Sequence, residues 1–143
     1  MQLFEAQDWL VKRGFGLVSC EYRRSPSHVF PTQLHDVKAC VRWVRAHAKQ
    51  YGLDPERIGV WGPSAGGHLA TLLATTGDSR DVEIEEEVGD HQVSSKVQAC
   101  CDYFGPAYLA ELTDFKVEWI VNDLLGGSAS EFSVRHGLFN ASS

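Results

Sequence analysis

The chain contains 143 residues, of which 43% are hydrophobic and 22% are charged, and its net charge is −6. These proportions are typical of a globular protein that forms one domain. The negative charge argues against a nucleic acid or an anionic membrane surface as the main partner. No apolar run approaches the roughly 20 residues that a membrane-spanning helix needs, and the N-terminus lacks a signal-peptide pattern. We therefore expect no membrane span and, by default, a cytoplasmic location; the oligomeric state stays open.

The first 52 residues indicate helix, strand and helix. An apolar stripe at helical spacing predicts a helix that stops at Gly14, and residues 15–22 (FGLVSCEY) are interpreted as a largely buried strand. A loop with two prolines follows, and a second helix begins near Pro31 and ends at Gly52. In that helix we expect the core-facing residues to be Leu34, Val37, Val41, Val44 and Ala48, and the outer residues to be Lys38, Arg42, Arg45 and Lys49.

The most informative pattern follows the short apolar strand 58–61. That strand runs into Gly62-Pro63-Ser64-Ala65-Gly66, which is Gly-x-Ser-x-Gly, and a helix of small residues follows over 65–76. This order predicts a nucleophile elbow, a strained turn that holds the serine at the C-terminal edge of a sheet. Side chains at Gly62 or Gly66 would crowd the bend, and Gly67 extends the space. The helix N-terminus favours negative charge such as an oxyanion; a purely structural turn is the alternative.

The remaining residues complete an alternating pattern. Residues 78–90 hold seven acidic groups and are expected to form a solvated loop. Residues 97–104 indicate another strand, and apolar spacing over 109–125 indicates one or two helices that end at Gly126 and Gly127. Alternating helices and strands predict an α/β fold with a mostly parallel sheet and helices on both faces.

Candidate metal and thiol sites are weak. Cys20, Cys40, Cys100 and Cys101 lack metal-ligand spacing and are expected to be buried free thiols. The stretch from Glu85 to His91 could offer metal ligands, but without rigid spacing a solvated loop is favoured. Asn140 matches the glycosylation pattern without a secretory context. We expect neither a metal nor a cofactor.

Several stretches resemble the α/β-hydrolase esterase/lipase group, most of all the bacterial carboxylesterases related to hormone-sensitive lipase and feruloyl esterases. They occur in the order and rough spacing of that group: 22–31 (YRRSPSHVFP), 34–37 (LHDV), 51–59 (YGLDPERIG), 62–70 (GPSAGGHLA), 102–106 (DYFGP) and 124–127 (LLGG). The resemblance implies one incomplete α/β-hydrolase domain over 1–143. Its parts are 1–77 up to the elbow helix, the acidic loop 78–96, the strand and helices 97–127, and the tail 128–143.

The resemblance also implies hydrolysis of small carboxylic esters through an acyl-enzyme, with Ser64 as nucleophile and the N–H of Ala65 as an oxyanion donor. The group takes further donors from an upstream His-Gly-Gly loop, and its acid and histidine follow later strands. Because the sequence contains none of these, we expect an inactive fragment. The alternatives are a non-enzymatic remnant, an interaction module, or a related peptidase or arylformamidase.

Several residues of the sequence could replace the missing acid and base. Asp102 ends a strand and is a candidate acid, but a carboxylate satisfied by loop N–H groups is the favoured interpretation. His68 is expected to face away from Ser64. Structural roles are favoured for His28 and His35, a solvent-facing position for His47, and no position is predicted for His91 or His136.

The sheet order that the resemblance implies, 1-2-4-3-5-6-7-8, makes 15–22, 58–61 and 97–104 the fourth, fifth and sixth strands. The third strand, which lies between the fourth and fifth, is then absent and leaves a slot roughly 10 Å wide. We expect the isolated chain either to be poorly stable or to pair its fourth and fifth strands directly.

Overall fold

The computed structural model describes residues 3–77, 79, 92–107, 109, 115–128 and 131. The elements in chain order are α1 (Leu3–Val11), α2 (Thr32–His47), the 3-10 helix η1 (Ala48–Tyr51), β1 (Gly59–Pro63), α3 (Ala65–Thr76), β2 (Ala99–Tyr103) and α4 (Phe115–Leu125). None of the described helices has both the length and the apolar character needed to cross a membrane.

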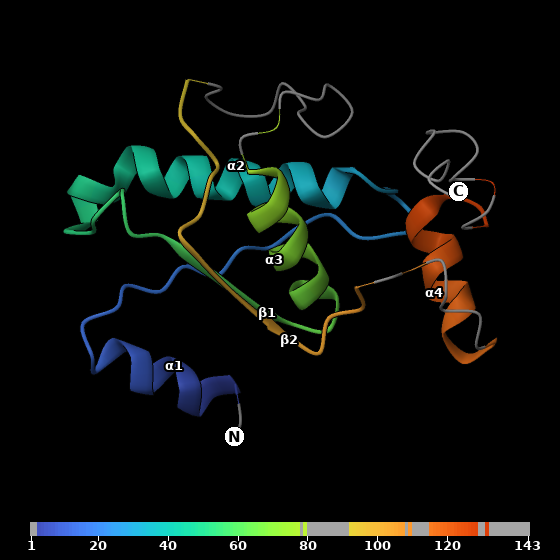
Figure 1. Ribbon diagram of the computed structural model, residues 1–143, viewed down its shortest axis with the longest axis horizontal. Helices are drawn as coiled ribbons and strands as arrows, with labels where there is room; N and C mark the ends of the chain where they lie inside the picture. The colour runs from blue at the N-terminus through green and yellow to red at the C-terminus, as the bar shows by residue number, and fades with distance from the viewer. Residues whose placement is uncertain are drawn as a thin grey trace, which may run out of the picture.

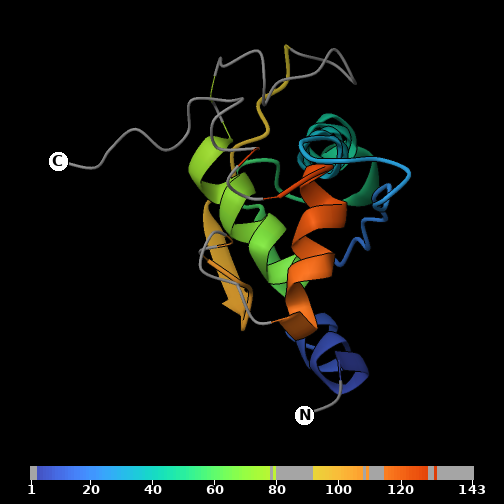
Figure 2. The same cartoon turned by 90° about the vertical axis from the view of Figure 1, so that its right-hand side faces the viewer.

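A β1–α3–β2 unit forms the centre of the fold (Figure 1). The two strands are parallel neighbours, with Gly59 opposite Ala99 and Pro63 opposite Tyr103. Parallel strands need a crossover connection, and α3 supplies its helix, packing against both strands. Figure 2 shows α3 between the strands and the long helix α2. The α/β class expected from the alternating pattern is confirmed, and α3 has the predicted bounds.

Two apolar clusters pack the helices against their neighbours in the fold. Leu34 and Val41 of α2 pack with Leu73 of α3, and Ile58, Val60 and Val97 from the strand region pack against them. These residues confirm part of the predicted core face of α2, together with Ala48, which is also buried. Val121 and Leu125 of α4 form a second cluster against Phe30, Leu109 and Leu124. The chain leaves η1 at Gly52, where φ of 70° ends the helical run as predicted.

The predicted outer face of α2 is partly wrong. Lys38 and Arg42 have exposed fractions of only 0% and 6%. The Lys38 ammonium donates to the carbonyl oxygen of Thr76 at 2.7 Å, at the C-terminal end of α3. A cation there meets the negative end of the helix dipole, which offsets part of the cost of burying it. The periodicity of α2 did not reveal that a second helix lies along this face.

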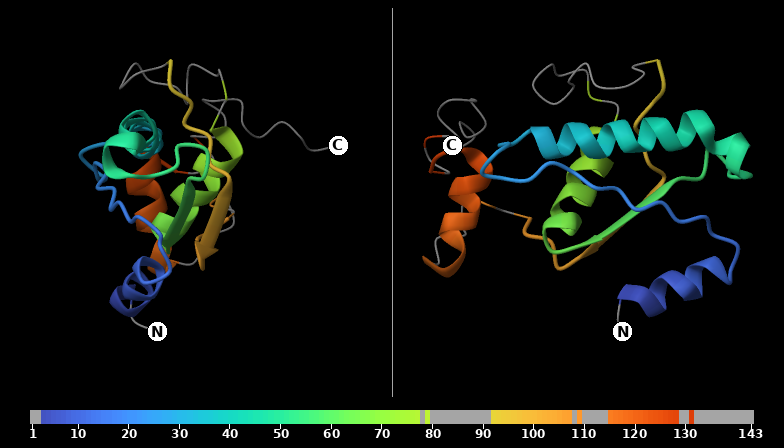
Figure 3. Two further views of the ribbon diagram at one scale, coloured as in Figure 1. Left: turned by 90° about the vertical axis from the view of Figure 1, so that its left-hand side faces the viewer. Right: turned by 180° about the vertical axis from the view of Figure 1, so that it is seen from behind.

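The buried strand predicted over residues 15–22 is also wrong. The segment makes no strand pairing with any described residue, and Phe15, Leu17 and Val18 are 44–58% exposed. Instead it runs as extended chain between α1 and the loop before α2, and α1 stands apart at one end of the molecule (Figure 3). A strand needs neighbours for its N–H and C=O groups, and β1 pairs only with β2 among the described strands. The alternative pairing of 15–22 with β1 is therefore not seen.

The four cysteines are free as predicted, but the prediction that they are buried is wrong, because Cys20 and Cys40 are half-buried and Cys100 and Cys101 are exposed. All five residues of β2 are exposed, although the strand pairs with β1 and contacts α3. The acidic loop apart from Ser79 and residues 92–96, and the tail apart from Ser128 and Glu131, lie outside the described residues. The division of the chain into a single incomplete domain stays a prediction.

Candidate active site

Ser64 is the single residue between the end of β1 and the start of α3. Its backbone adopts φ 51° and ψ −122°, a conformation that non-glycine residues rarely adopt. The Ser64 N–H donates to the carbonyl oxygen of Tyr103 at 3.0 Å, and the Ser64 carbonyl accepts the His68 N–H at 3.1 Å. The strained turn is therefore fixed from both sides, by the end of β2 and by the first turn of α3.

The Ser64 residue is exposed, as is Ala65 next to it. Among the described residues, the Ser64 side chain makes no hydrogen bond and does not cap α3. Ala65 opens the helix, so its N–H belongs to the first turn, where N–H groups have no intrahelical acceptor. The arrangement leaves a hydroxyl beside the positive end of a helix dipole, which is the geometry that the sequence predicted for this turn.

Two glycines permit the bend. A Cβ at Gly62 would collide with the backbone of Gly66, whose Cα would lie 2.9 Å away. A Cβ at Gly67 would meet the Asp102 carboxylate, the Gly62 carbonyl oxygen at 2.9 Å and the Gly105 Cα at 3.0 Å. The expectation for Gly66 itself was wrong, because its nearest neighbour would be Pro63 Cδ at an ordinary 3.5 Å. The Gly66 backbone is close to Gly62, but its own Cβ position is open.

Asp102 braces the turn below the elbow. Its Oδ1 accepts the Gly105 N–H at 2.6 Å, and its Oδ2 accepts the Thr71 hydroxyl of α3 at 3.3 Å. No histidine among the described residues hydrogen-bonds this carboxylate. The structure thus places Asp102 close to the elbow but uses its oxygens to join β2 to α3, as the structural alternative predicted.

His68 faces the same turn rather than the serine hydroxyl. Its Nδ1 lies 2.7 Å from the Pro106 carbonyl oxygen. Because a carbonyl only accepts, Nδ1 carries the proton. His68 therefore ties α3 to the segment after β2, in agreement with the expectation that it is not the base.

The other histidines lie away from the elbow or outside the described part. His28 is exposed in the loop before α2, and His35 lies in the first turns of α2. His47 is not simply solvent-facing, because it stacks on Trp43 with ring centroids 4.5 Å apart and its Nδ1 lies 2.8 Å from the Trp43 carbonyl oxygen. His91, His136, Asn140 and the 85–91 candidate metal stretch lie outside the described residues. In the described ranges, no group of three or more His, Cys, Asp or Glu residues could hold a metal ion.

The sequence interpretation missed an aromatic pair beside the elbow. Tyr103 and Phe104 have ring centroids 4.7 Å apart and are 57% and 69% exposed. Phe104, with φ 51°, is the other non-glycine residue with positive φ in the described part of the chain. A signal for this turn was available in the sequence, because Asp102 and Gly105 flank the aromatic pair. An aspartate followed closely by a glycine is typical of a tight turn, and such a turn exposes the residues between them.

Comparisons with known proteins support the class of fold. The chain is 35% identical over 105 residues to the "Probable carboxylic ester hydrolase LipM" of Mycobacterium tuberculosis, which covers 73% of this chain and 23% of LipM. It is 35% identical over 104 residues to "Esterase LipQ" of the same organism, which covers 73% of this chain and 24% of LipQ. The chain thus spans about a quarter of the length of these curated relatives.

Similar solved structures indicate the same class of protein. The "Truncated form of carbohydrate esterase from gut microbiota" matches with 38% identity and a TM-score of 0.65, over 71% of this chain and 38% of that one. A bifunctional GH43-CE protein of Bacteroides eggerthii matches with 35% identity and a TM-score of 0.78, over 87% of this chain and 18% of that one. The molecule has part of an α/β-hydrolase fold and groups with the esterases, which confirms the resemblance found in the sequence.

Within that class, the chain belongs to the BD-FAE family, whose model matches residues 1–135. Its named relatives are carboxylic ester hydrolases and esterases, so the chain is a member of a hydrolase family.

Proposed function

We propose that this chain carries the nucleophile of a serine carboxylesterase, with Ser64 as the attacking residue and the Ala65 N–H as an oxyanion donor. The observation that carries the proposal is the turn itself. Ser64 is held at φ 51° between a strand and a helix, is exposed, and has a hydroxyl without a hydrogen bond to any described residue. Strained backbone of this kind clusters at active sites, so a strained, exposed serine with an unbonded hydroxyl supports a chemical role.

The chemistry follows the acyl-enzyme route. The Ser64 oxygen attacks the carbonyl carbon of a small ester while its proton passes to a histidine base, and the tetrahedral oxyanion accepts the Ala65 N–H. Collapse expels the alcohol and leaves an acyl group on Ser64, which water then removes. The N-terminus of α3 stabilises the negative charge that develops beside it. No step in this route needs a metal or an organic cofactor.

The chain by itself is proposed to be an inactive fragment, because no base or second oxyanion donor accompanies Ser64 among the described residues. Removing the base of a serine triad costs on the order of 10⁶ in turnover. Losing one oxyanion donor costs roughly 10² to 10³ more. A serine on a correctly formed elbow therefore gives little hydrolysis above background until the remaining groups are supplied.

A chimera tests the proposal directly. This chain would replace the matching segment of the carbohydrate esterase from gut microbiota, which then supplies the flanking residues. We expect the folded chimera to cleave p-nitrophenyl acetate and to be labelled by a fluorophosphonate at Ser64, whereas the isolated 143-residue chain does neither at a comparable rate.

Matched serine variants complete the test. Ser64→Ala in the chimera should abolish both labelling and turnover, and Ser27→Ala, at another exposed serine far along the chain from the elbow, should leave both unchanged. A folded chimera that stays unlabelled would support the non-enzymatic remnant or interaction module. A labelled chimera that cleaves amides and not esters would support the peptidase or arylformamidase alternative.

A further inference from the structure

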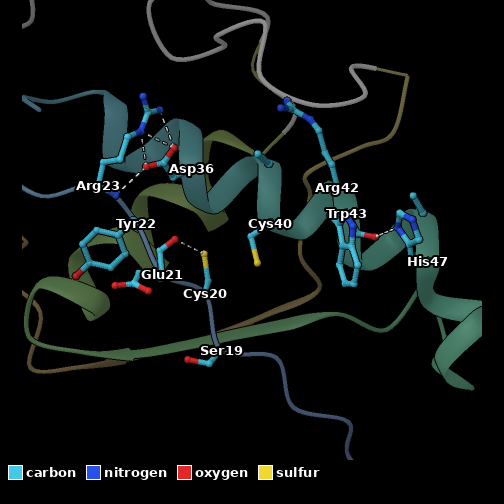
Figure 4. Close-up of a pocket in the computed structure, with 12 residues that line it drawn as sticks. Ser19, Cys20, Glu21, Tyr22, Arg23, Asp36, Cys40, Arg42, Trp43 and His47 are labelled. Atoms are coloured by element: carbon cyan, nitrogen blue, oxygen red, sulfur yellow. Dashed lines mark hydrogen bonds and ion pairs between the residues drawn. The ribbon is translucent and has the colours of Figure 1, made fainter.

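A groove away from the elbow contains two facing thiols. It has a volume of about 860 Å³ and lies between the extended segment at Ser19–Arg23 and helix α2. Cys20 enters it from the extended segment and Cys40 from the middle of α2, and Figure 4 shows their sulfur atoms directed toward one another. Both residues are half-buried, so the groove shields them in part but leaves them accessible to small molecules.

The two thiols are not equivalent. The neighbouring Cys20 thiol lowers the pKa of Cys40 to about 7, although burial acts in the opposite direction. The neighbouring Cys40, burial and the negative charge of Asp36 raise the pKa of Cys20. The Cys20 thiol donates to the Glu21 carbonyl oxygen, 3.6 Å away, and so keeps its proton on Cys20. Near neutral pH, a large fraction of Cys40 is therefore thiolate while Cys20 stays a thiol, and the thiolate is the nucleophilic form of cysteine.

The charged residues around the groove are consistent with a lower pKa for Cys40 than for Cys20. The segment contributes Glu21 and Arg23 to the groove, and α2 contributes Asp36, Arg42 and His47. Arg23 is bound to Asp36, with Nη2–Oδ1 at 2.7 Å and Nε–Oδ2 at 3.0 Å, so this pair largely neutralises itself at one end of the groove. Asp36 lies one helical turn from Cys40, and its negative charge is among the causes that raise the pKa of Cys20.

We propose that Cys20 and Cys40 form a dithiol modification site that reacts with low-molecular-weight disulfides, with Cys40 as the attacking and Cys20 as the resolving residue. The Cys40 thiolate attacks a disulfide RSSR, forming a Cys40–SR mixed disulfide and releasing RS⁻. Cys20 then loses its proton, attacks the Cys40 sulfur and expels the second RS⁻, which is protonated to RSH. Overall, one RSSR is reduced to two RSH and the two protein thiols are oxidised to one disulfide.

The structure allows the bond to close. Bonded sulfur atoms lie about 2.0 Å apart, closer than two free thiols approach, so one backbone must move. Residues 15–22 have no strand partner among the described residues and can shift toward α2 more easily than a strand held in a sheet. The disulfide would join this segment to the long helix beside it.

Cys100 and Cys101 provide an internal comparison. Both are exposed on β2, and as adjacent strand residues they point to opposite faces of the sheet. Burial together with the negative charges of Asp102 and Cys101 raises the pKa of Cys100. Exposure alone would make these two cysteines the reactive ones, whereas the proposal predicts that Cys40 reacts first.

The test uses the whole 143-residue chain with oxidised glutathione at neutral pH, followed by peptide mapping without reduction. We expect a Cys20–Cys40 cross-linked peptide to appear before any glutathione is found on Cys100 or Cys101. Iodoacetamide should alkylate Cys40 fastest, with half-maximal rate at a pH of about 7, and unfolding in urea should remove this difference among the cysteines. Equal reactivity of all four thiols in the folded chain, or modification of Cys100 first, would overturn the proposal.

Two substitutions at one position separate the roles. Cys20→Ser keeps a hydrogen-bond donor but removes the resolving sulfur, so glutathione should accumulate on Cys40. Cys20→Ala also removes the donor, so the alkylation of Cys40 should shift to higher pH. The double variant Cys100→Ser with Cys101→Ser should form the cross-link at an unchanged rate. A cross-link that fails to form in the unsubstituted folded chain would sink the proposal, whatever the variants do.

Discussion

The Ser64 N–H donates to the Tyr103 carbonyl oxygen at 3.0 Å, so the end of β2 holds the turn that presents the proposed nucleophile. The same segment is also tied to α3, because the Asp102 carboxylate accepts the Thr71 hydroxyl and the Pro106 carbonyl oxygen accepts a hydrogen bond from His68. The elbow is therefore a three-part assembly of β1, α3 and the end of β2. Its geometry depends on contacts that span about forty residues of sequence.

Gly67→Ala should destabilise the chain because the new methyl group would meet the Asp102 carboxylate and the Gly62 carbonyl oxygen. Overpacking of this kind costs about 1–3 kcal/mol. Gly66→Ala is the matched control, since its methyl group would lie 3.5 Å from Pro63 Cδ. Urea unfolding of the two variants should show a large loss for Gly67→Ala and a small change for Gly66→Ala; equal losses would mean that the packing below the elbow is wrong.

Asp102 is expected to be a brace rather than the catalytic acid. In the esterase chimera, Asp102→Asn should retain activity, because the asparagine Oδ1 still accepts the Gly105 N–H. Asp102→Ala removes that acceptor and should lower the free energy of unfolding by about 1 kcal/mol. The two readouts are turnover of p-nitrophenyl acetate and urea unfolding. Loss of turnover in a stable Asp102→Asn variant would instead identify Asp102 as the acid.

The parts of the fold that the sequence predicted well are those set by local chemistry. The elbow follows from a strand, two close-packed glycines and a helix, all within residues 58–76. The bounds of α3 and the end of the helical run at Gly52 also depend on nearby residues. The prediction of the esterase class depends on motifs of the same local kind.

The wrong predictions concern neighbours that are distant in sequence. Residues 15–22 have the composition of a buried strand, but no described strand pairs with them. Lys38 fits an outer helix face in the periodicity of α2, yet α3 covers it. Cys100 was expected to be buried as part of an apolar strand, and β2 turned out to be an exposed edge. In each case a tertiary contact, or its absence, decides burial.

Lys38 provides a test of buried charge in the helix interface. Lys38→Ala should remove both the bond to the Thr76 carbonyl oxygen and most of a fully buried side chain, at a cost of about 2–4 kcal/mol. Lys38→Met keeps the length of the side chain without its charge and should cost less, because replacing a buried charge by an apolar group of similar volume is often nearly neutral. Thermal and urea unfolding measure both. Lys49→Ala, at an exposed position of η1, is the control and should change little.

The Arg23–Asp36 pair predicts an acid-dependent loss of stability near the thiol groove. Burial raises the pKa of Asp36, but the side-chain and backbone hydrogen bonds from Arg23 and its charge outweigh burial, so the pKa lies below its ordinary value. A carboxyl whose pKa is lower in the folded state than in the unfolded state stabilises the fold above the unfolded pKa, about 3.9. That stability is lost as the pH falls through the folded pKa.

Unfolding measured from about pH 6 to about pH 2 should therefore show a steeper acid limb in the unsubstituted chain than in Arg23→Gln, which cannot hold the charged carboxylate in the same way. Arg24→Gln is the matched control, because Arg24 is more exposed and its ion pair within the described residues is a 4.0 Å contact with Glu21. Identical acid limbs in the unsubstituted chain and Arg23→Gln would show that residues 22–24 do not dock on α2 through this pair, and would also remove the support it gives to the segment that carries Cys20.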